Sequence, residues 1–284
     1  MGQLVGGILA IAVAGLIGLL LTPYFKGLEP INPVLLSWGG LTIYWYGLLM
    51  AIAVVAGTVW LAWRLRSTPF AGHTVNLAVV ATIGGIVGAR LVFVLLKWPE
   101  FSGGWLMILN LAGGGLSIHG ALIVGALSLW LYMRWQKLPA LKLFDEIVPA
   151  VVIGQIIGRF GNFFNQEAFG PPTNLPWKMF VGEIFRPVGL ESAVYYHPTF
   201  LYSIVGLLAL LVITGGLLMR KLPPGIILLV YIGAYCLLRF GIEFMRVDSD
   251  FWYGLTIAQW FSLLAIIFVV MIGLILRYKV RRFR

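Results

Sequence analysis

The stretch VNLAVVATIGGIVGARLVFVLL, residues 75–96, is an almost unbroken apolar run that contains one charged residue, Arg90. A helix of about 20 residues spans a hydrocarbon core of roughly 30 Å, because each residue rises about 1.5 Å. The composition agrees, since 61% of the 284 residues are hydrophobic and 11% are charged, against about 25% charged residues in soluble domains. The sequence therefore predicts an all-α integral membrane protein.

Eight apolar segments of this kind follow one another, which predicts a polytopic bundle of seven or eight transmembrane helices. They are residues 4–21, 42–63, 75–96, 116–135, 144–164, 199–219, 225–244 and 256–277. The first has no basic region before it and no small-residue cleavage site after it. We therefore interpret residues 1–27 as an extra retained span rather than a signal peptide. Whether that segment crosses the membrane stays open.

Lysine and arginine are distributed unevenly between alternate connections. Twelve lie at the end of or after the second, fourth, sixth and eighth segments, five lie in the other connections, and three lie deeper within segments. Because basic residues are enriched in cytoplasmic loops, we expect the basic tail, residues 278–284, in the cytoplasm. The long connection of residues 165–197, whose four prolines preclude a continuous helix, is then external. These topology determinants account for the net charge of +10, so no nucleic-acid partner is expected.

Several ionisable side chains lie within or at the ends of apolar segments, where a charge costs about 2.5–3.5 kcal/mol on insertion scales. They are Arg90, His119, Arg159, Glu167, Arg239 and Glu243. Such residues either pair and join helices or mark a functional site. Arg239, Glu243 and Arg246 are spaced i, i+4 and i+7, so they are expected on one helix face.

A second polar stripe consists of Arg159, Asn162 and Gln166, if the helix continues that far. Arginines and amides directed at a common cavity suit a phosphate, because a guanidinium binds phosphate oxygens as a bidentate fork. An anionic head group is therefore the expected ligand. The chain has three scattered histidines and one cysteine, so no metal site is predicted.

The stretch GRFGNFFNQEAFG, residues 158–170, resembles the signature of the bacterial prolipoprotein diacylglyceryl transferases. Further similar stretches follow in that family's order: YWYG at 44–47, GARL at 88–91, GGLSIHGAL at 114–122, HPT at 197–199 and RFGIEFMR at 239–246. The resemblance extends from about Glu29 to Arg277. It departs from the family at Ala121, where glycine is usual, and at Phe200 and Ser203, where Gln and Glu are usual.

The resemblance implies an enzyme of lipoprotein biosynthesis in the bacterial inner membrane. Such enzymes transfer the sn-1,2-diacylglyceryl group of phosphatidylglycerol to the lipobox cysteine thiol of a prolipoprotein, form a thioether and release glycerol phosphate. The resemblance implies catalysis without a cofactor. The composition predicts a single transmembrane domain, residues 1–284, and the polar stripes, whose outward ends lead into the external connection, predict a site toward the external leaflet. A free thiol is only about 3% ionised at pH 7, so a base or a local positive field would assist this reaction.

The resemblance also implies roles for individual residues. Arg159 and Arg239 would hold the phosphate, and Asn162 would orient it. His119, which follows a run of glycines, would accept the thiol proton, with Tyr46 as a supporting donor or an alternative relay. These are the catalytic assignments.

The remaining assignments concern substrate binding. Glu243 would pair with Arg239 or Arg246 and fix its rotamer. Glu167 and Gly170 would shape the turn of the signature. Arg90, like Asp145 before the signature helix, is equally compatible with a structural role.

Two other classes of protein also contain charged residues within apolar segments or span a membrane by such segments. A transporter of an anionic lipid or small anion would need the same buried arginines, but also paired broken helices in two related halves. No such halves are evident in the sequence, and the transporter is kept as the alternative function. A membrane scaffold gives no reason for so many intramembrane charges.

The distribution of basic residues makes a topology prediction. A reporter fused after Arg284 should report a cytoplasmic location. An Asn174→Cys variant should react with an impermeant thiol reagent in intact cells. The parent chain, which contains Cys236, is the control for background labelling. Labelling at position 174 only after permeabilisation would contradict the assignment.

Overall fold

The computed structural model describes residues 18, 21–101, 104, 106–111 and 114–282, with side chains as far as residue 276. It divides the chain into two compact units, each described by itself below. The first unit comprises Met1–Ala51, Gln155–Val212 and Tyr231–Arg284, and the second comprises Ile52–Gly154 and Ile213–Val230. The predicted extra span at residues 4–21 lies outside the described residues, apart from positions 18 and 21.

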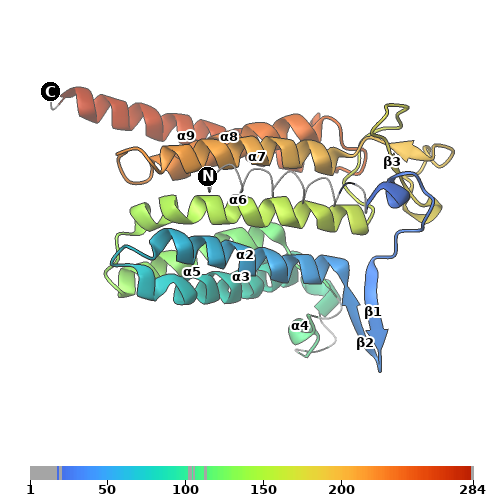
Figure 1. Ribbon diagram of the computed structural model, residues 1–284, viewed down its shortest axis with the longest axis horizontal. Helices are drawn as coiled ribbons and strands as arrows, with labels where there is room; N and C mark the ends of the chain where they lie inside the picture. Colours follow the sequence, from blue (N-terminus) through green and yellow to red (C-terminus); the bar gives the residue numbers. More distant parts are fainter. Residues whose placement is uncertain (1–17, 19–20, 102–103, 105, 112–113, 283–284) are drawn as a thin grey trace, which may run out of the picture. The chain divides into compact units, whose positions relative to one another are not determined.

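Long helices make up most of the described chain (Figure 1). They are α2 (Trp45–Leu65), α3 (Thr74–Leu96), α5 (Ile118–Trp135), α6 (Ala140–Phe164), α7 (Thr199–Leu217), α8 (Ile226–Glu243) and α9 (Ile257–Arg282). Each coincides within a few residues with a predicted apolar segment, so the helical fold is confirmed.

Five described helical stretches are long and apolar enough to cross a membrane. They are Trp45–Leu65, Ala71–Leu96, Thr199–Leu217, Ile226–Glu243 and Ile257–Leu276. Only 11% to 33% of each is fully buried inside the protein, so most of their side chains stay at least partly exposed, as expected of helices that contact lipid. The chain is a multi-pass helical membrane protein. The predicted count of seven or eight spans is not established by these five.

Short elements connect the helices. They are the strands β1 (Val34–Trp38), β2 (Leu41–Tyr44), β3 (Met179–Phe180), β4 (Tyr195–Tyr196), β5 (Phe251–Trp252) and β6 (Leu255–Thr256), the helix α4 (Leu106–Leu109), and the 3₁₀ turns η1 (Ala71–His73), η2 (Trp98–Phe101) and η3 (Glu183–Phe185). The strands form three antiparallel pairs, β1–β2, β3–β4 and β5–β6.

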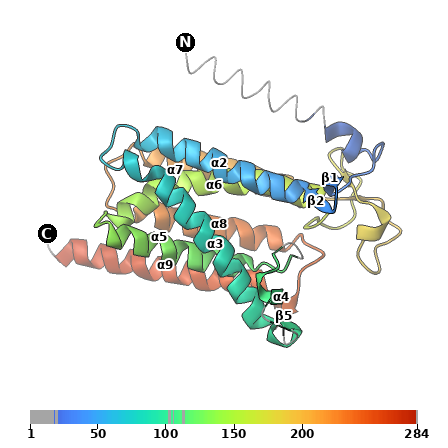
Figure 2. The same cartoon turned by 90° about the horizontal axis from the view of Figure 1, so that it is seen from below.

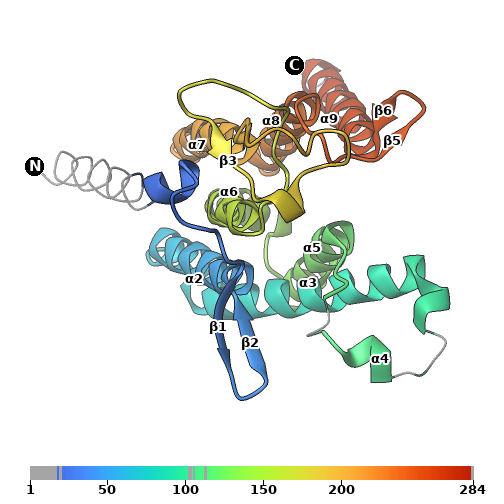
Figure 3. The same ribbon diagram turned by 90° about the vertical axis from the view of Figure 1, so that its right-hand side faces the viewer.

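The all-α prediction missed these strand pairs, because strands of two to five residues carry little periodic signal. The β1–β2 hairpin precedes α2 and extends away from its first turn (Figure 3). Its two turn residues, Gly39 and Gly40, both have positive φ, at 56° and 83°. A two-residue turn of this kind needs that conformation, which glycine adopts without strain.

In the second unit, α3 and α5 pack against each other through glycines (Figure 2). A Cβ atom on Gly88 would overlap the side chain of Val124 and the carbonyl oxygen of Gly120, and one on Gly120 would lie 2.7 Å from Cβ of Val92. Small residues at such contacts let helix backbones approach closely, which is a main source of helix association in membranes.

The second unit also contains a buried carboxylate at the start of α8. Asp145 of α6 accepts hydrogen bonds from the backbone N–H of Gly225 at 2.7 Å and of Leu228 at 2.8 Å. The first N–H groups of a helix have no partner within the helix, and its dipole favours a negative charge there. Of the two roles left open for Asp145, these contacts support the structural one.

In the first unit, a core of aromatic and aliphatic side chains lies under the connection between α6 and α7. It includes Phe163, Phe169, Met179, Val181, Tyr196 and Phe200, all buried. This connection contains no α-helix, as its prolines predicted. The core fixes the end of α6 and the start of α7, the two elements that begin and end the connection.

The close contact between α3 and α5 makes a stability prediction. Gly120→Ala should lower the free energy of unfolding by about 1–3 kcal/mol, because the added methyl group has no room. Gly273→Ala is the matched control, since its Cβ would meet nothing within 4 Å. Thermal unfolding of the purified proteins in detergent measures both, and equal midpoints for Gly120→Ala and wild type would show that the contact is not tight.

Candidate functional site

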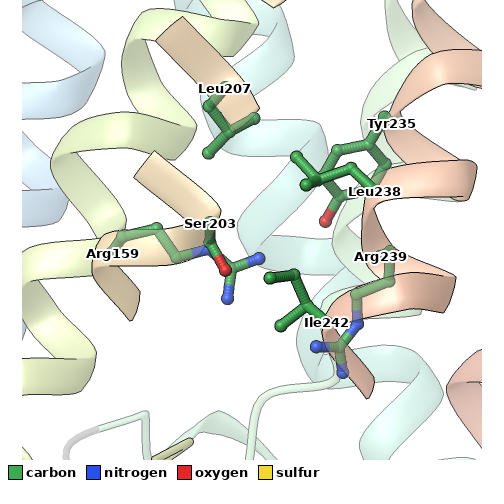
Figure 4. Close-up of a pocket in the computed structure, with 7 residues that line it drawn as sticks. All are labelled: Arg159, Ser203, Leu207, Tyr235, Leu238, Arg239 and Ile242. Carbon is green, nitrogen blue, oxygen red and sulfur yellow. The ribbon is translucent and has the colours of Figure 1, made fainter. Parts of the chain in front are cut away.

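A small pocket lies between α6, α7 and α8 in the first unit (Figure 4). It is lined by Arg159, Ser203, Leu207, Tyr235, Leu238, Arg239 and Ile242. Arg159 extends from α6 toward α8, and the hydroxyl group of Tyr235 faces the same space. Two of the predicted arginines, carried by different helices, therefore line one pocket.

Arg239 is held on one side only. Its Nη2 atom forms an ion pair with Oε2 of Glu243, one helical turn later, at 2.7 Å. The other oxygen of Glu243, Oε1, accepts a hydrogen bond from the Ser249 hydroxyl group at 2.6 Å. The second terminal nitrogen of Arg239, Nη1, is buried and has no hydrogen-bond partner among the described residues. Of the two partners predicted for Glu243, it pairs with Arg239.

Arg159 is half-buried, and the described part of the chain gives its guanidinium group no hydrogen bond and no ion pair. A partly buried cation without a counter-ion is unfavourable, so the arrangement favours a bound anion. Two guanidinium groups with free donors facing one pocket can bind the oxygens of a phosphate by charge-assisted hydrogen bonds.

Both predicted polar stripes are shorter than their spacing suggested. Helix α6 ends at Phe164, and Gln166 lies beyond it in a left-handed conformation with φ at 49°. Helix α8 ends at Glu243, so Arg246 lies outside it and binds Asp248 with two hydrogen bonds of 2.9 and 3.0 Å. The expectation of a shared helix face is therefore wrong for Arg246, and the condition on which Gln166 was included, that the helix continues that far, is not met.

The turn of the signature stretch is held by its own polar side chains. Oε1 of Glu167 accepts a hydrogen bond from Nδ2 of Asn162 at 2.9 Å. Gly170 is needed for close packing, because a Cβ atom there would lie 2.8 Å from Cβ of His197 and from a backbone carbonyl oxygen. These contacts agree with a shaping role for Glu167 and Gly170, while their part in substrate binding stays a prediction.

Tyr46, near the start of α2, lies against α6 in the same unit. A Cβ atom on Gly161 would come within 2.5 Å of the Tyr46 ring, so glycine is required for this contact. The hydroxyl group of Tyr46 lies within electrostatic range of Glu167 and Arg159. The structure thus brings Tyr46 together with two other predicted site residues.

Arg90 belongs to the second unit, where its buried guanidinium group donates to four backbone carbonyl oxygens. The acceptors are those of Met107 at 2.6 Å, Ile108 at 2.7 Å, Gly114 at 2.8 Å and Gly115 at 3.0 Å. These bonds fix the segment that leads into α5. They support the structural alternative for Arg90, and its predicted role in substrate binding stays untested.

His119 also belongs to the second unit and is the second residue of α5. The helix begins after Ser117, whose side chain accepts a hydrogen bond from the N–H of Gly120 at 3.4 Å, and whose own N–H donates to the carbonyl oxygen of Ala89 at 2.9 Å. Other residues of the chain leave His119 exposed. In the part of the chain that the structure describes, no three His, Cys, Asp or Glu side chains are grouped to hold a metal ion.

The sequence is similar to that of known proteins over most of its length. Residues 33–275 match the sequence profile of the prolipoprotein diacylglyceryl transferase family. The chain belongs to this family. Relatives named phosphatidylglycerol–prolipoprotein diacylglyceryl transferase include those of Synechocystis sp. (40% identity over 83% of this chain and 86% of the relative), Gloeobacter violaceus (40%, over 86% and 93%) and Synechococcus elongatus (41%, over 88% and 89%).

Sequence reasoning missed three polar residues of this diacylglyceryl transferase family member. Tyr235 precedes Arg239 by four residues, so the same helix-face rule would have found it. Ser203 was noted only as a departure from the family pattern, although it lines the pocket. Asp248 belongs to none of the sequence motifs described above. Burial would raise the pKa of its carboxyl group, but the hydrogen bond and charge of Arg246 and the N–H of Ala168 hold that pKa below its usual range.

Proposed function

We propose that this membrane protein is a phosphatidylglycerol–prolipoprotein diacylglyceryl transferase. It transfers the sn-1,2-diacylglyceryl group to the lipobox cysteine thiol, forms a thioether and releases glycerol phosphate. The observation that carries the proposal is the pocket where Arg159 and Arg239 present guanidinium nitrogens without partners among the described residues. Family membership supplies the reaction, and no observation favours the alternative of a transporter.

The arginines act on the leaving group. The cysteine sulfur attacks the glyceryl carbon that bears the phosphate ester, the C–S bond forms, and the C–O bond breaks with its electron pair passing to the departing phosphate oxygen. Negative charge therefore grows at the phosphoryl oxygens. Arg159 and Arg239, carried by α6 and α8, stabilise that charge, and each such donor is worth about 10²–10³ in rate by analogy with oxyanion donors. Asn162 orients the phosphate.

The thiol must lose its proton before or during the attack. We assign His119 as the acceptor, because histidine is the side chain that most often serves as a general base. Tyr46 is the supporting donor or the alternative relay, and its position within electrostatic range of Arg159 and Glu167 supports that assignment.

The proposed setting is the bacterial inner membrane, with seven or eight spans in a single catalytic domain. The C-terminal tail is cytoplasmic and the site opens toward the external leaflet, as the distribution of basic residues supports. The substrates are then phosphatidylglycerol from the bilayer and the signal peptide of a prolipoprotein that carries a lipobox.

The direct test uses the purified protein, phosphatidylglycerol vesicles and a lipobox peptide. The peptide should gain the mass of one diacylglyceryl group on its cysteine, with release of glycerol phosphate. A peptide with Ser in place of that Cys, and vesicles of phosphatidylcholine alone, are the controls. Absence of the mass gain with folded protein would refute the proposal.

The two arginines provide the first activity prediction. Arg159→Ala and Arg239→Ala should each lower turnover by about 10²-fold or more, because each removes one donor from the developing charge. The corresponding Lys variants should recover little, since an ammonium group cannot form the bidentate fork. Transfer is measured on protein whose membrane insertion has been confirmed. Near-normal turnover in an Ala variant would remove that arginine from the site.

The proton acceptor provides the second activity prediction. His119→Gln should still bind phosphatidylglycerol but lose about 10²–10⁴-fold in turnover. A higher pH should restore part of the loss, because more of the peptide thiol is then ionised without a base. A pH–rate series at saturating lipid measures this. A Gln variant within about threefold of wild type across the series would exclude His119 as the general base.

A further inference from the structure

The segment of residues 246–249 follows α8 and is bonded to both polar sides of the site. We call it the strap. Its last two residues, Asp248 and Ser249, lie outside the lining of the phosphate pocket. Asp248 bonds to Arg246 and Ala168, and Ser249 bonds to Glu243, the ion-pair partner of the pocket residue Arg239.

The first connection runs from Asp248 to the signature turn. Oδ1 of Asp248 accepts from Nε of Arg246 at 2.9 Å, and Oδ2 accepts both from Nη2 of Arg246 at 3.0 Å and from the backbone N–H of Ala168 at 3.0 Å. Both carboxylate oxygens are therefore occupied. The Ala168 contact joins the strap to the turn that carries Glu167, and through Glu167 to Asn162.

Ala168 is a residue whose backbone needs such support. Its φ is 57°, in the left-handed region that a residue with a Cβ atom rarely adopts. Its N–H is held by Asp248, and its carbonyl oxygen accepts a hydrogen bond from the hydroxyl group of Thr199 at the start of α7. Conformations of this kind persist where the surroundings fix them. Asp248 supplies one of those two fixing bonds.

The second connection runs from Ser249 to Arg239. The Ser249 hydroxyl group donates to Oε1 of Glu243 at 2.6 Å, and Oε2 of Glu243 pairs with Nη2 of Arg239 at 2.7 Å. Glu243 is buried, so loss of the serine donor would leave one carboxylate oxygen without that bond. The direction of the Arg239 guanidinium group thus depends on Ser249 through one intermediate side chain.

We propose that Asp248 and Ser249 are positioning residues for the lipid phosphate, Asp248 by holding the signature turn and Ser249 by holding the carboxylate that orients Arg239. Neither side chain lines the pocket, so each acts through another residue. The inference rests on the proposed function, and it names the residues that set the geometry of that site.

Removal of the Asp248 carboxylate has a second effect, on Arg246. The acids within electrostatic range of Arg246 are Asp248, Glu243 and Glu167. Without Asp248, the strongest partner of Arg246 is lost, and the freed guanidinium group competes with Arg239 for Glu243. Loss of Asp248 therefore acts on both halves of the phosphate site, whereas loss of Ser249 acts on Arg239 alone.

The test compares Asp248→Ala, Asp248→Asn and Ser249→Ala with wild type in two measurements. One is the binding of a short-chain phosphatidylglycerol to the purified full-length protein, and the other is kcat and KM for transfer to a lipobox peptide. Asp250→Asn is the matched control, because this neighbouring carboxylate is exposed and its side chain makes no hydrogen bond or ion pair with the described residues.

Asp248→Ala should weaken lipid binding and raise KM for the lipid about tenfold or more, in line with the loss of charged hydrogen bonds. Asp248→Asn keeps an acceptor for the Ala168 N–H but loses the ion pair, so it should fall between Ala and wild type. Ser249→Ala should weaken binding by a smaller factor, and Asp250→Asn should match wild type. Unchanged lipid binding and KM in the folded Asp248→Asn and Ser249→Ala variants would overturn the inference, even if Asp248→Ala failed to fold.

A purely structural role would lower the unfolding midpoint and leave the lipid affinity of the folded protein unchanged, which also counts against the inference. Failure of the proposed function looks different. In that case wild type itself gives no transfer, and the binding measurement alone still decides whether the strap sets affinity for the phosphate.

Discussion

The cost of holding charge in an apolar medium governs this protein, because each intramembrane charge must find compensating groups. The chain meets that cost in several ways. Arg90 is surrounded by backbone carbonyl oxygens, Asp145 accepts from the free N–H groups that begin α8, and Arg239 is paired with Glu243. Arg159 differs from these, since the described residues give it neither an ion pair nor a hydrogen bond. The charge left uncompensated is one that lines the pocket.

Helices carry the two arginines of the pocket, and segments of irregular backbone carry polar groups that bond near the ends of those helices. Arg159 and Arg239 are placed by α6 and α8, whose positions follow from apolar length. Arg239 is paired with Glu243 at the end of α8, and the hydroxyl group that bonds to Glu243 comes from Ser249 of the strap, beyond the helix. Left-handed residues at Gln166 and Ala168 bend the chain back so that side chains from a loop reach groups at the helix ends. Precision in this site therefore resides in short non-helical segments.

Much of the frame could be predicted from the sequence, because apolar runs of about 20 residues have few structural solutions. The pairing of Arg239 with Glu243 also follows from spacing alone, since i and i+4 meet on a helix. Prediction was weakest at the helix ends that precede Gln166 and Arg246, because no residue there marks where the helix stops. The bond from Ala168 to Asp248 joins residues 80 positions apart. A contact of that kind depends on tertiary packing, which local patterns do not encode.

The cap that Asp145 provides for α8 has a consequence for biosynthesis. The carboxylate and the Gly225 N–H that it accepts from are separated by 80 residues, so α6 is translated roughly 4–16 s before its partner at about 5–20 residues per second. During that interval the carboxylate has neither of its two donors, which is unfavourable in an apolar medium. The first turns of α6 therefore reach their final contacts only after the next helical hairpin has emerged from the ribosome. The order of assembly of the bundle thus depends on hydrogen-bond donors that a later segment of the chain supplies.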